Sequence, residues 1–353
     1  MKAAVLFRLD QPLEILDGLE YAPPVRGPVL VRLAYSGVCH SQLMEVRGWR
    51  GHDAYLPHLL GHEGTGRVVA VGEGVTKVRS GDLVILGWIK GSGLEAGGVK
   101  YRCSCMDQPI NAGAVTTFNE YALVSENRVG PLPDGIPLDV GVLFGCAVPT
   151  GAGIITNDLR PAEGSRLVVF GLGGIGMSAL MATQLYKCGM VIAVDVSAEK
   201  LRLAHEFGAT HILDARRCDP VVEIRKLTEG TGVDFAVEAS GLAHVIEQAF
   251  ASVRRAGGVC VFASHPEQGI KISIDPYELI CGKQIRGSWG GNSNPDRDIQ
   301  MFAKLYREGR LPLEKLITKR YPLEAINEAL EDLEKHRVGR PLIEIDKNLA
   351  QSQ

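Results

Sequence analysis

Two cysteines and one histidine, each in a glycine-bearing segment, are the side chains of this chain best suited to hold a metal. Cys39 lies in Gly-Val-Cys-His-Ser, His62 and Glu63 in Gly-His-Glu-Gly-Thr-Gly, and Cys146 in Gly-Cys-Ala-Val-Pro-Thr-Gly. Two thiolates and one imidazole suit Zn²⁺, and three protein ligands leave open the fourth position that a catalytic zinc needs. Taken alone, each residue is more typical of a buried inert thiol or a satisfied histidine. The spacing does not show that the two cysteines meet.

A glycine turn after an expected strand is the second chemical pattern. Gly171 permits a tight turn, Gly173 lets the backbone approach a pyrophosphate, and Gly176 allows close packing of helix on strand. The helix that follows offers free N–H groups to phosphates. The residues expected to bind the cofactor here are Gly171, Gly173, Gly174, Ile175 and Gly176. The alternative is an ordinary glycine-rich turn.

Asp195 falls at the end of the next expected strand. A carboxylate at that position accepts hydrogen bonds from ribose hydroxyls and repels a 2′-phosphate, which favours NAD over NADP. The alternative is a capping aspartate. Together with an open zinc site, a nicotinamide cofactor indicates hydride transfer to and from an alcohol.

Length, charge and hydropathy narrow the class of protein. A chain of 353 residues can form two domains with full cores. The net charge of −3 argues against nucleic acid or an anionic membrane surface as a partner. We find no run of apolar residues long enough to span a bilayer and no signal peptide, and expect a cytoplasmic protein. Its eight cysteines are then expected to be reduced.

The pattern of expected secondary structure changes near residue 148. Before it, short apolar runs such as 29–35, 66–72 and 81–86 alternate with turn signals, which predicts a β-rich, barrel-like domain. After it, expected strands alternate with expected helices, which predicts βαβ units and a parallel sheet. The tail returns to a helix followed by a strand, and the last few residues read as disordered.

Over nearly its whole length, the chain resembles the zinc-dependent medium-chain alcohol dehydrogenases. The resemblance rests on the three ligand segments, the glycine turn, Gly-Asp-Leu-Val-Ile at 81–85, Val-Asp-Val-Ser-Ala-Glu-Lys at 194–200 and Gly-Ser-Trp-Gly-Gly at 287–291. It implies an α/β fold with two domains. A GroES-like β-barrel catalytic domain would cover 1–147 and be completed by 289–353. A Rossmann domain with a doubly wound parallel sheet would cover 148–288, with the active site in the cleft between them. It also implies a homodimer or homotetramer.

The resemblance assigns metal and proton roles residue by residue. Cys39, His62 and Cys146 would hold one catalytic zinc per chain, and Glu63 would sit behind or transiently on the metal. Ser41 would hydrogen-bond the substrate oxygen and pass its proton toward the cofactor ribose.

The resemblance also assigns roles in cofactor binding. His40 would contact the pyrophosphate, Thr150 would touch the nicotinamide side, and Arg340 would reach a phosphate. Asp195 and Lys200 would bind the adenosine ribose.

The chain departs from the family pattern at a second, structural zinc. Many relatives hold that zinc with four cysteines in a lobe after the segment of Trp88. Alignment of the lobe places four non-cysteine residues at these positions: Gly93, Ala96, Val99 and Asp107. Cys103 and Cys105 lie nearby, but two thiols cannot replace four. We predict no structural zinc and a remodelled lobe; a metal shared with a partner chain through these two thiols is the less favoured alternative.

Two further departures concern His62 and the proton path. Relatives often have an aspartate at the position of Gln42, where it orients the zinc-ligand histidine. Gln42 is expected to accept that hydrogen bond without charge. Met44 stands near the place of a proton-carrying histidine, a role that His52 could take if its loop folded over the site.

Two features bear on the substrate, a small-molecule alcohol or carbonyl compound. Trp88 would line the pocket, although a core aromatic is an equally good interpretation. The loop 47–53 carries several positive groups and could favour a polar, polyol- or sugar-derived substrate, although an exposed charged loop is the commoner case.

The predicted function is NAD-linked interconversion of a primary or secondary alcohol with its aldehyde or ketone. One alternative is a zinc-free, NADPH-dependent reductase of activated double bonds on the same scaffold. Another is a non-catalytic nucleotide-binding relative, which the fold alone could not exclude.

Overall fold

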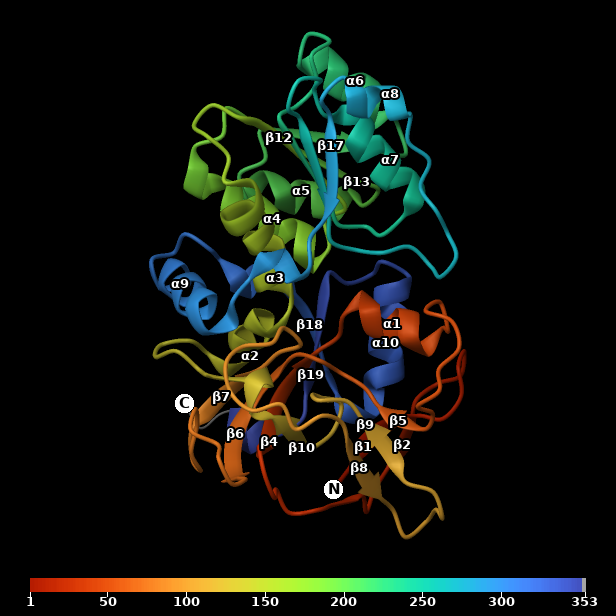
Figure 1. Ribbon diagram of the computed structural model, residues 1–353, viewed down its shortest axis with the longest axis vertical. Helices are drawn as coiled ribbons and strands as arrows, with labels where there is room; N and C mark the ends of the chain where they lie inside the picture. The colour runs from red at the N-terminus through yellow and green to blue at the C-terminus, as the bar shows by residue number, and fades with distance from the viewer. Residues whose placement is uncertain (351–353) are drawn as a thin grey trace. The chain divides into compact units, whose positions relative to one another are not determined.

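The computed structural model describes residues 1–350, which divide into two compact units (Figure 1). The first unit comprises Met1–Cys146 and the segment from Asn294 onward, and the second comprises Ala147–Ser293. The expected domains, 1–147 with 289–353 and 148–288, remain predictions as functional domains. We expect the last few residues to be disordered, and three of them, 351–353, lie outside the described part of the chain.

The first unit contains two β-sheets. One has the order β2 (Glu14–Leu16), β1 (Ala3–Leu6), β5 (His58–Leu59), β9 (Ile110–Ala112), β8 (Val99–Arg102), β3 (Glu20–Tyr21). The other has the order β11 (Val129–Pro131), β7 (Leu83–Leu86), β6 (Gly64–Val71), β4 (Pro28–Gly37), β19 (Arg340–Glu344), β18 (Ile317–Pro322), with β10 (Tyr121–Ser125) also paired to β4. The helices of this unit are α1 (His40–Val46), α2 (Leu138–Gly141), α9 (Pro295–Arg307), α10 (Ile326–Glu334) and α11 (Lys347–Ala350).

Strand β4 is the central element of the first unit. Nine of its ten residues are buried, because side chains on both of its faces enter apolar cores. Val29, Val31 and Leu33 belong to one core, whereas Leu30 belongs to another. This alternation follows the two-residue period of an extended strand. The strand ends at Gly37, two positions before Cys39, which caps the start of α1.

The second unit is built on a parallel sheet of six strands. Their order is β14 (His211–Asp214), β13 (Met190–Asp195), β12 (Arg166–Phe170), β15 (Phe235–Glu238), β16 (Val259–Phe262), β17 (Gln284–Gly287). The helices are α3 (Ala147–Gly153), α4 (Gly174–Thr183), α5 (Ala198–Glu206), α6 (Pro220–Leu227), α7 (Ala243–Ser252) and α8 (Pro276–Ile280). Helices α6 and α7 share an apolar core with one face of the sheet, and α4 and α5 lie on the other side (Figure 1). The α/β fold and the Rossmann-like parallel sheet are therefore confirmed.

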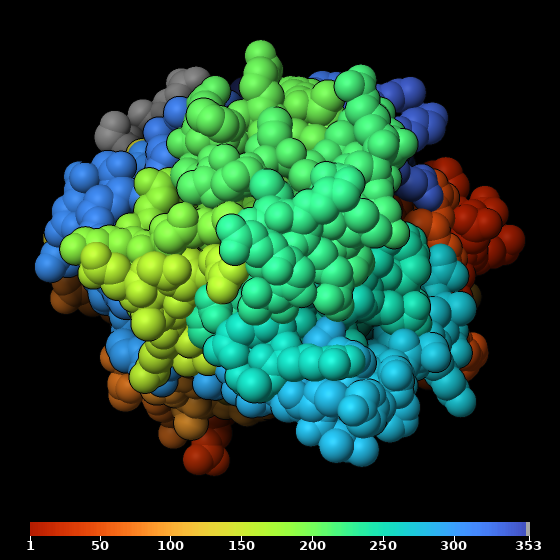
Figure 2. Space-filling model, turned by 90° about the horizontal axis from the view of Figure 1, so that it is seen from above, coloured from red at the N-terminus to blue at the C-terminus, as the bar shows by residue number. Residues whose placement is uncertain are grey.

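The order of this sheet reverses between β12 and β15, because the chain leaves β14 and returns on the other side of β12. Ligands of open α/β sheets bind beyond the carboxyl ends of the strands at such a switch point. The glycine turn 171–176 follows β12 at this edge. Viewed from above, the segments from α5 to α8 form a continuous outer surface (green to light blue in Figure 2).

Within residues 1–350, no single helix is long and apolar enough to cross a membrane; Leu138–Gly145 and Ala147–Leu159 pass that test only as a bent pair, on length and composition.

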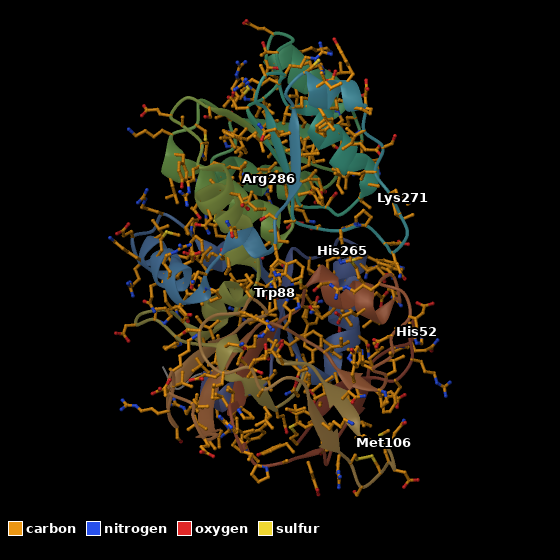
Figure 3. The ribbon with its side chains drawn as sticks, viewed as in Figure 1. His52, Trp88, Met106, His265, Lys271 and Arg286 are labelled. Atoms are coloured by element: carbon orange, nitrogen blue, oxygen red, sulfur yellow. A yellow bond between two sulfur atoms is a disulfide. The ribbon has the colours of Figure 1, made fainter. Side chains whose placement is uncertain are left out.

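The lobe predicted to lack a structural zinc forms the β8–β9 hairpin, with Met106 near its tip (Figure 3). Val99 lies in β8, and cysteine occupies none of the four aligned ligand positions. Cys103 and Cys105 form a disulfide, so the expectation that all eight cysteines are reduced is wrong for this pair. The physical reason is a turn, closed by a hydrogen bond from Met106 N to Cys103 O, which brings the two α-carbons to 5.1 Å. That separation lies within the range a disulfide spans.

Candidate metal and dinucleotide sites

Three segments of the first unit bring the predicted metal ligands together. Cys39 precedes α1, His62 lies between β5 and β6, and Cys146 follows a short 3₁₀ turn, Val142–Gly145. One ligand atom from each of the three lies within 4.8 Å of the others. Nε2 of His62 is buried without a hydrogen-bond partner. An imidazole nitrogen facing two buried sulfurs is the donor set that Zn²⁺ fits, and within residues 1–350 no fourth protein ligand belongs to the group.

Two glycines make room for Glu63 beside these ligands. A Cβ on Gly37 would meet the carboxyl carbon of Glu63 at 2.6 Å, and a Cβ on Gly145 would meet Cβ of Glu63 at 2.9 Å. At Gly37 a larger residue would require Glu63 to move, and at Gly145 the added Cβ would also meet the backbone oxygen of Leu86 at 2.3 Å. The glycines that flank both cysteine segments therefore have a packing role at the site.

Glu63 is paired with Arg340 rather than placed among the metal-ligand atoms. Both side chains are buried, and Nη2 of Arg340 donates to Oε1 of Glu63. Burial is the largest influence on the pKa of Glu63 and raises it, although Arg340 opposes that rise. Burial disfavours the charge of Arg340, but the nearby Glu63, Cys39 and Cys146 more than offset it, and the pKa of Arg340 is raised. Arg340 is thus a buried cation among anionic groups, and its predicted contact with a phosphate remains a prediction.

The two thiols of the site differ in acidity. Hydrogen bonding with Cys146 lowers the pKa of Cys39 well below its ordinary value, with help from Arg340 and His62. The same hydrogen bond, together with burial, raises the pKa of Cys146. Cys39 is therefore the more acidic of the two thiols, and a bound cation would favour both thiolates because metal ligation deprotonates a thiol.

The surroundings of His62 differ from the expectation for Gln42. Oε1 of Gln42 accepts a hydrogen bond from the backbone N–H of Cys39 at 3.0 Å, so Nε2 of its amide faces Nδ1 of His62. The oxygen expected to accept from the histidine is thus engaged by the helix cap. Oγ of Ser41, 3.3 Å from the same Nδ1, is the remaining acceptor. Ser41 therefore lies against a metal ligand, as a proton-handling hydroxyl would.

Trp88 lies beside the metal-ligand histidine. Its ring centroid is 6.5 Å from that of His62, in an edge-to-face arrangement. His40 is exposed, with its ring 6.1 Å from that of Trp49. His52 is exposed and lies to the right of Trp88 in the view of Figure 3. The roles expected for Trp88 in the pocket and for His40 at the pyrophosphate remain predictions.

The two arginines of the loop 47–53 form ion pairs. Arg47 contacts Glu334 at 2.6 Å and Asp10 at 3.3 Å, and Arg50 contacts Glu45 at 2.5 Å. Arg47 and Arg50 therefore each have an acidic partner, and a role of the loop in substrate binding remains a prediction.

The glycine turn of the second unit has the geometry that its sequence predicts. Gly171 has a φ of +83°, a value that favours glycine. A Cβ on Gly176 would lie 1.8 Å from the carbonyl oxygen of Gly171, whereas a Cβ on Gly173 would meet nothing within 4 Å. Gly176 is thus required for packing, and Gly173 faces open space where a phosphate could approach. Gly174 and Ile175 begin α4, whose N-terminus adjoins that space.

Asp195, the last residue of β13, is tied to this turn. Its Oδ2 accepts from the backbone N–H of Leu172 at 2.6 Å, and its Oδ1 accepts from Ser197 at 2.8 Å. Lys200 lies in the first turn of α5, five residues further on. Thr150, in α3, is buried, and its Oγ1 has no hydrogen-bond partner in the described part of the chain. These positions suit the ribose and nicotinamide roles that the resemblance implies.

The roles of three carboxylates were not predicted from the sequence. Glu95 and Glu126 bind the lobe after Trp88 to the rest of the unit, and Glu238 is buried at the end of β15. Glu95 and Glu126 could have been suspected from the absence of cysteine at the four aligned positions, because a lobe without those ligands must be held by other contacts. For Glu238, the signal was a carboxylate that directly ends an apolar strand.

Comparison with known families agrees with this geometry. Residues 26–134 match the family model of the alcohol dehydrogenase GroES-like domain, and residues 174–307 match that of the zinc-binding dehydrogenases. S-(hydroxymethyl)glutathione dehydrogenase of Haemophilus influenzae is 31% identical, covering 97% of this chain and 96% of the relative. Alcohol dehydrogenase 2 of Zea mays is 31% identical, covering 94% and 93%.

Solved structures resemble the chain over the same extent. An alcohol dehydrogenase zinc-binding domain protein from Burkholderia ambifaria gives a TM-score of 0.88 at 32% identity, covering 98% of each chain. Benzyl alcohol dehydrogenase from Acinetobacter calcoaceticus gives 0.86 at 29% identity, covering 98% of this chain and 99% of that one. With its ligand set and glycine turn in place, the chain belongs to the family of zinc-dependent medium-chain alcohol dehydrogenases.

Proposed function

We propose that the chain catalyses the reversible, NAD-linked oxidation of a primary or secondary alcohol to its aldehyde or ketone. The observation that carries this proposal is the convergence of Cys39, His62 and Cys146 around an unpartnered imidazole nitrogen. When bound, zinc would supply the Lewis acid and NAD the hydride acceptor. The zinc-free reductase is not favoured, because its scaffold has no use for this ligand set.

The protein's own residues position and deprotonate the alcohol. Oγ of Ser41 would accept a hydrogen bond from the substrate hydroxyl and pass its own proton toward the cofactor ribose as it takes up the substrate's proton. Its contact with Nδ1 of His62 holds the Ser41 hydroxyl near the metal ligands. Buried Arg340 offsets the negative charge of Glu63, and a bound zinc ion would offset the charge of the two thiolates. Asp195 would accept from the ribose hydroxyls, and the space beside Gly173 would receive the pyrophosphate.

The substrate we propose carries an apolar group on its carbinol carbon. Trp88 gives the metal-ligand histidine an aromatic neighbour, and Arg47 and Arg50 of the loop 47–53 already have acidic partners. The expectation of a polyol- or sugar-derived substrate rests on the sequence alone. One structural relative is a benzyl alcohol dehydrogenase, which makes benzyl alcohol the first compound to assay.

The experiment compares NAD reduction with benzyl alcohol, hexan-1-ol, xylitol and S-(hydroxymethyl)glutathione, using the wild type, Trp88→Ala and Cys146→Ala. We expect benzyl alcohol to give the highest kcat/KM, Trp88→Ala to lower it mainly through KM, and Cys146→Ala to abolish turnover of every compound. Turnover by Cys146→Ala would refute the metal-dependent reaction. A preference for xylitol or the glutathione adduct that survives Trp88→Ala would refute the substrate class.

We also propose that two copies associate through the free edge of the parallel sheet. Strand β17 ends that sheet, and the segment around it exposes several large apolar side chains: Tyr277, Leu279, Ile280 and Trp289. Unpaired strand edges and apolar patches of this kind are typical of interfaces. Light scattering would test it: Ile280→Glu should shift a dimer or tetramer toward monomer. A closed GroES-like barrel and a cytoplasmic location also belong to the proposal.

A further inference from the structure

A buried carboxylate underlies the glycine turn of the second unit. Glu238 ends β15 and is 0% exposed. Its Oε1 accepts three hydrogen bonds, from the backbone N–H of Ser240 at 2.6 Å, from the hydroxyl of Ser240 at 2.5 Å and from the backbone N–H of Gly241 at 3.0 Å. Its Oε2 is buried without a hydrogen-bond partner among the described residues. The carboxylate therefore shapes the turn 239–241 with one oxygen only.

The turn 239–241 packs directly against the first glycine of the dinucleotide-binding turn. The backbone N–H of Ala239 donates to the carbonyl oxygen of Phe170 at 2.9 Å, at the end of β12. A Cβ on Gly171 would meet the backbone nitrogen of Ser240 at 2.8 Å and the carbonyl carbon of Ala239 at 3.0 Å. A shift of the turn 239–241 would therefore displace Gly171, where the phosphate-binding backbone begins.

No cation compensates the charge of Glu238 within the strands beside it. Its register partners are Phe170 on β12 and Phe262 on β16. One titratable neighbour is the thiol of Cys260 on β16, whose pKa is raised by burial, so it stays neutral. Another is His265 after β16, whose backbone lies against Gly241 and whose side chain is exposed, with its Nδ1 near the carbonyl oxygen of Pro266. Burial without a cation raises the pKa of Glu238 to about 7, although Ser240 and Gly241 oppose that rise.

The helices around β15 contribute few charges. Helix α4 contains no ionisable side chain. Helix α7 carries His244, which is exposed, and Glu247, which accepts from the backbone N–H of Ser273. Asp195 at the end of β13 is engaged by Leu172 and Ser197.

We propose that Glu238 is a positioning residue for cofactor binding: as a carboxylate it holds the turn 239–241, and through it Gly171, in the shape that receives the dinucleotide phosphates, and its protonation loosens that shape. Hydrogen bonds to a carboxylate are roughly twice as strong as those to a neutral oxygen. A proton on the unpartnered Oε2 therefore weakens all three bonds at Oε1. This inference rests on the proposed binding of NAD at the glycine turn.

The test measures the Kd of ADP-ribose by calorimetry between pH 6 and pH 8.5. ADP-ribose carries the phosphates and riboses but no nicotinamide, and its charge is constant over this range. Because protonation occurs as the pH falls through about 7, wild-type affinity should fall roughly fivefold from pH 8.5 to pH 6. Glu238→Gln is neutral at every pH and should bind with the weaker affinity throughout, with a flat profile.

Two further variants keep the test decisive. Cys260→Ala removes the neighbouring thiol and should keep the wild-type profile. Ser240→Ala removes one donor to Oε1, so its midpoint should move to higher pH; this variant carries the test if Glu238→Gln does not fold, as judged by circular dichroism. Parallel profiles for wild type and Glu238→Gln, or an unmoved midpoint in Ser240→Ala, would overturn the inference. Absence of ADP-ribose binding even at pH 8.5 would instead refute the cofactor site, and the inference with it.

Discussion

Glu126 anchors the lobe after Trp88, in which cysteine is replaced at the four aligned positions of the structural-zinc ligands. It is 1% exposed, and its Oε1 accepts from the backbone N–H groups of Thr76 at 2.7 Å and Lys77 at 2.8 Å. Its Oε2 accepts from Leu94 in the lobe at 2.7 Å. Gly93 stands at one of the aligned positions of the structural-zinc ligands. A Cβ there would meet Cγ of Glu126 at 2.7 Å, so the side chain of Glu126 occupies the space that a larger residue would need.

Glu126→Ala should therefore destabilise the protein strongly. Each hydrogen bond to a charged acceptor contributes about 1.5–3 kcal/mol. Water can reach the backbone of exposed Thr76 once the side chain is gone, which offsets part of the loss. We expect a net loss of about 3 kcal/mol and a fall in Tm of roughly 6–12 °C for a unit of this size. Glu126→Gln keeps one acceptor oxygen, so its Tm should lie between those of Glu126→Ala and the wild type.

Thermal unfolding followed by circular dichroism measures this effect. The matched control is Glu73→Ala, since Glu73 is exposed in the same β6–β7 connection and should change stability by less than about 0.5 kcal/mol. The pKa of Glu126 is lowered, because the backbone hydrogen bonds that it accepts outweigh the effect of burial, and this fixes how its contribution to stability depends on pH. Its contribution is present above the pKa of an unfolded glutamate and is lost as the pH falls. Equal Tm values for Glu126→Ala and Glu73→Ala would refute the anchor.

The remaining predictions concern the metal site and the disulfide. Gln42→Asp should slow zinc loss to a chelator by roughly tenfold, because a carboxylate can accept from Nδ1 of the zinc-ligand histidine; an unchanged rate would show that Gln42 does not limit zinc retention. Gly37→Ala should lower the zinc content of the purified protein, because its Cβ would overlap Glu63; full zinc content would show that Glu63 can move aside at no cost. Thiol titration of denatured, unreduced protein should find six free thiols, and eight after reduction; eight before reduction would contradict the Cys103–Cys105 pair.

The sequence predicts the local parts of the structure well. The strands at 166–170 and 190–195, the glycine turn between them and Asp195 at the strand end all follow from local patterns of apolar, small and acidic residues. These features depend on neighbours in the chain, so a single segment contains the information.

Contacts between distant segments could not be predicted in the same way. Arg340 pairs with Glu63 across 277 positions, and Arg47 pairs with Glu334 across 287. A lone charged residue does not indicate which partner tertiary folding will bring to it. The Gln42 amide does contact His62 as expected, but the hydrogen bond of its oxygen to the cap of α1 was not predicted, and neither was the role of Glu126.

Zinc content per chain tests the central claim most directly. Elemental analysis of protein purified without chelator should find one zinc per chain in the wild type and in the Cys103→Ser, Cys105→Ser double variant, and almost none in Cys146→Ala. These results would assign the metal to Cys39, His62 and Cys146. Two zincs per chain, or full zinc content in Cys146→Ala, would contradict the account.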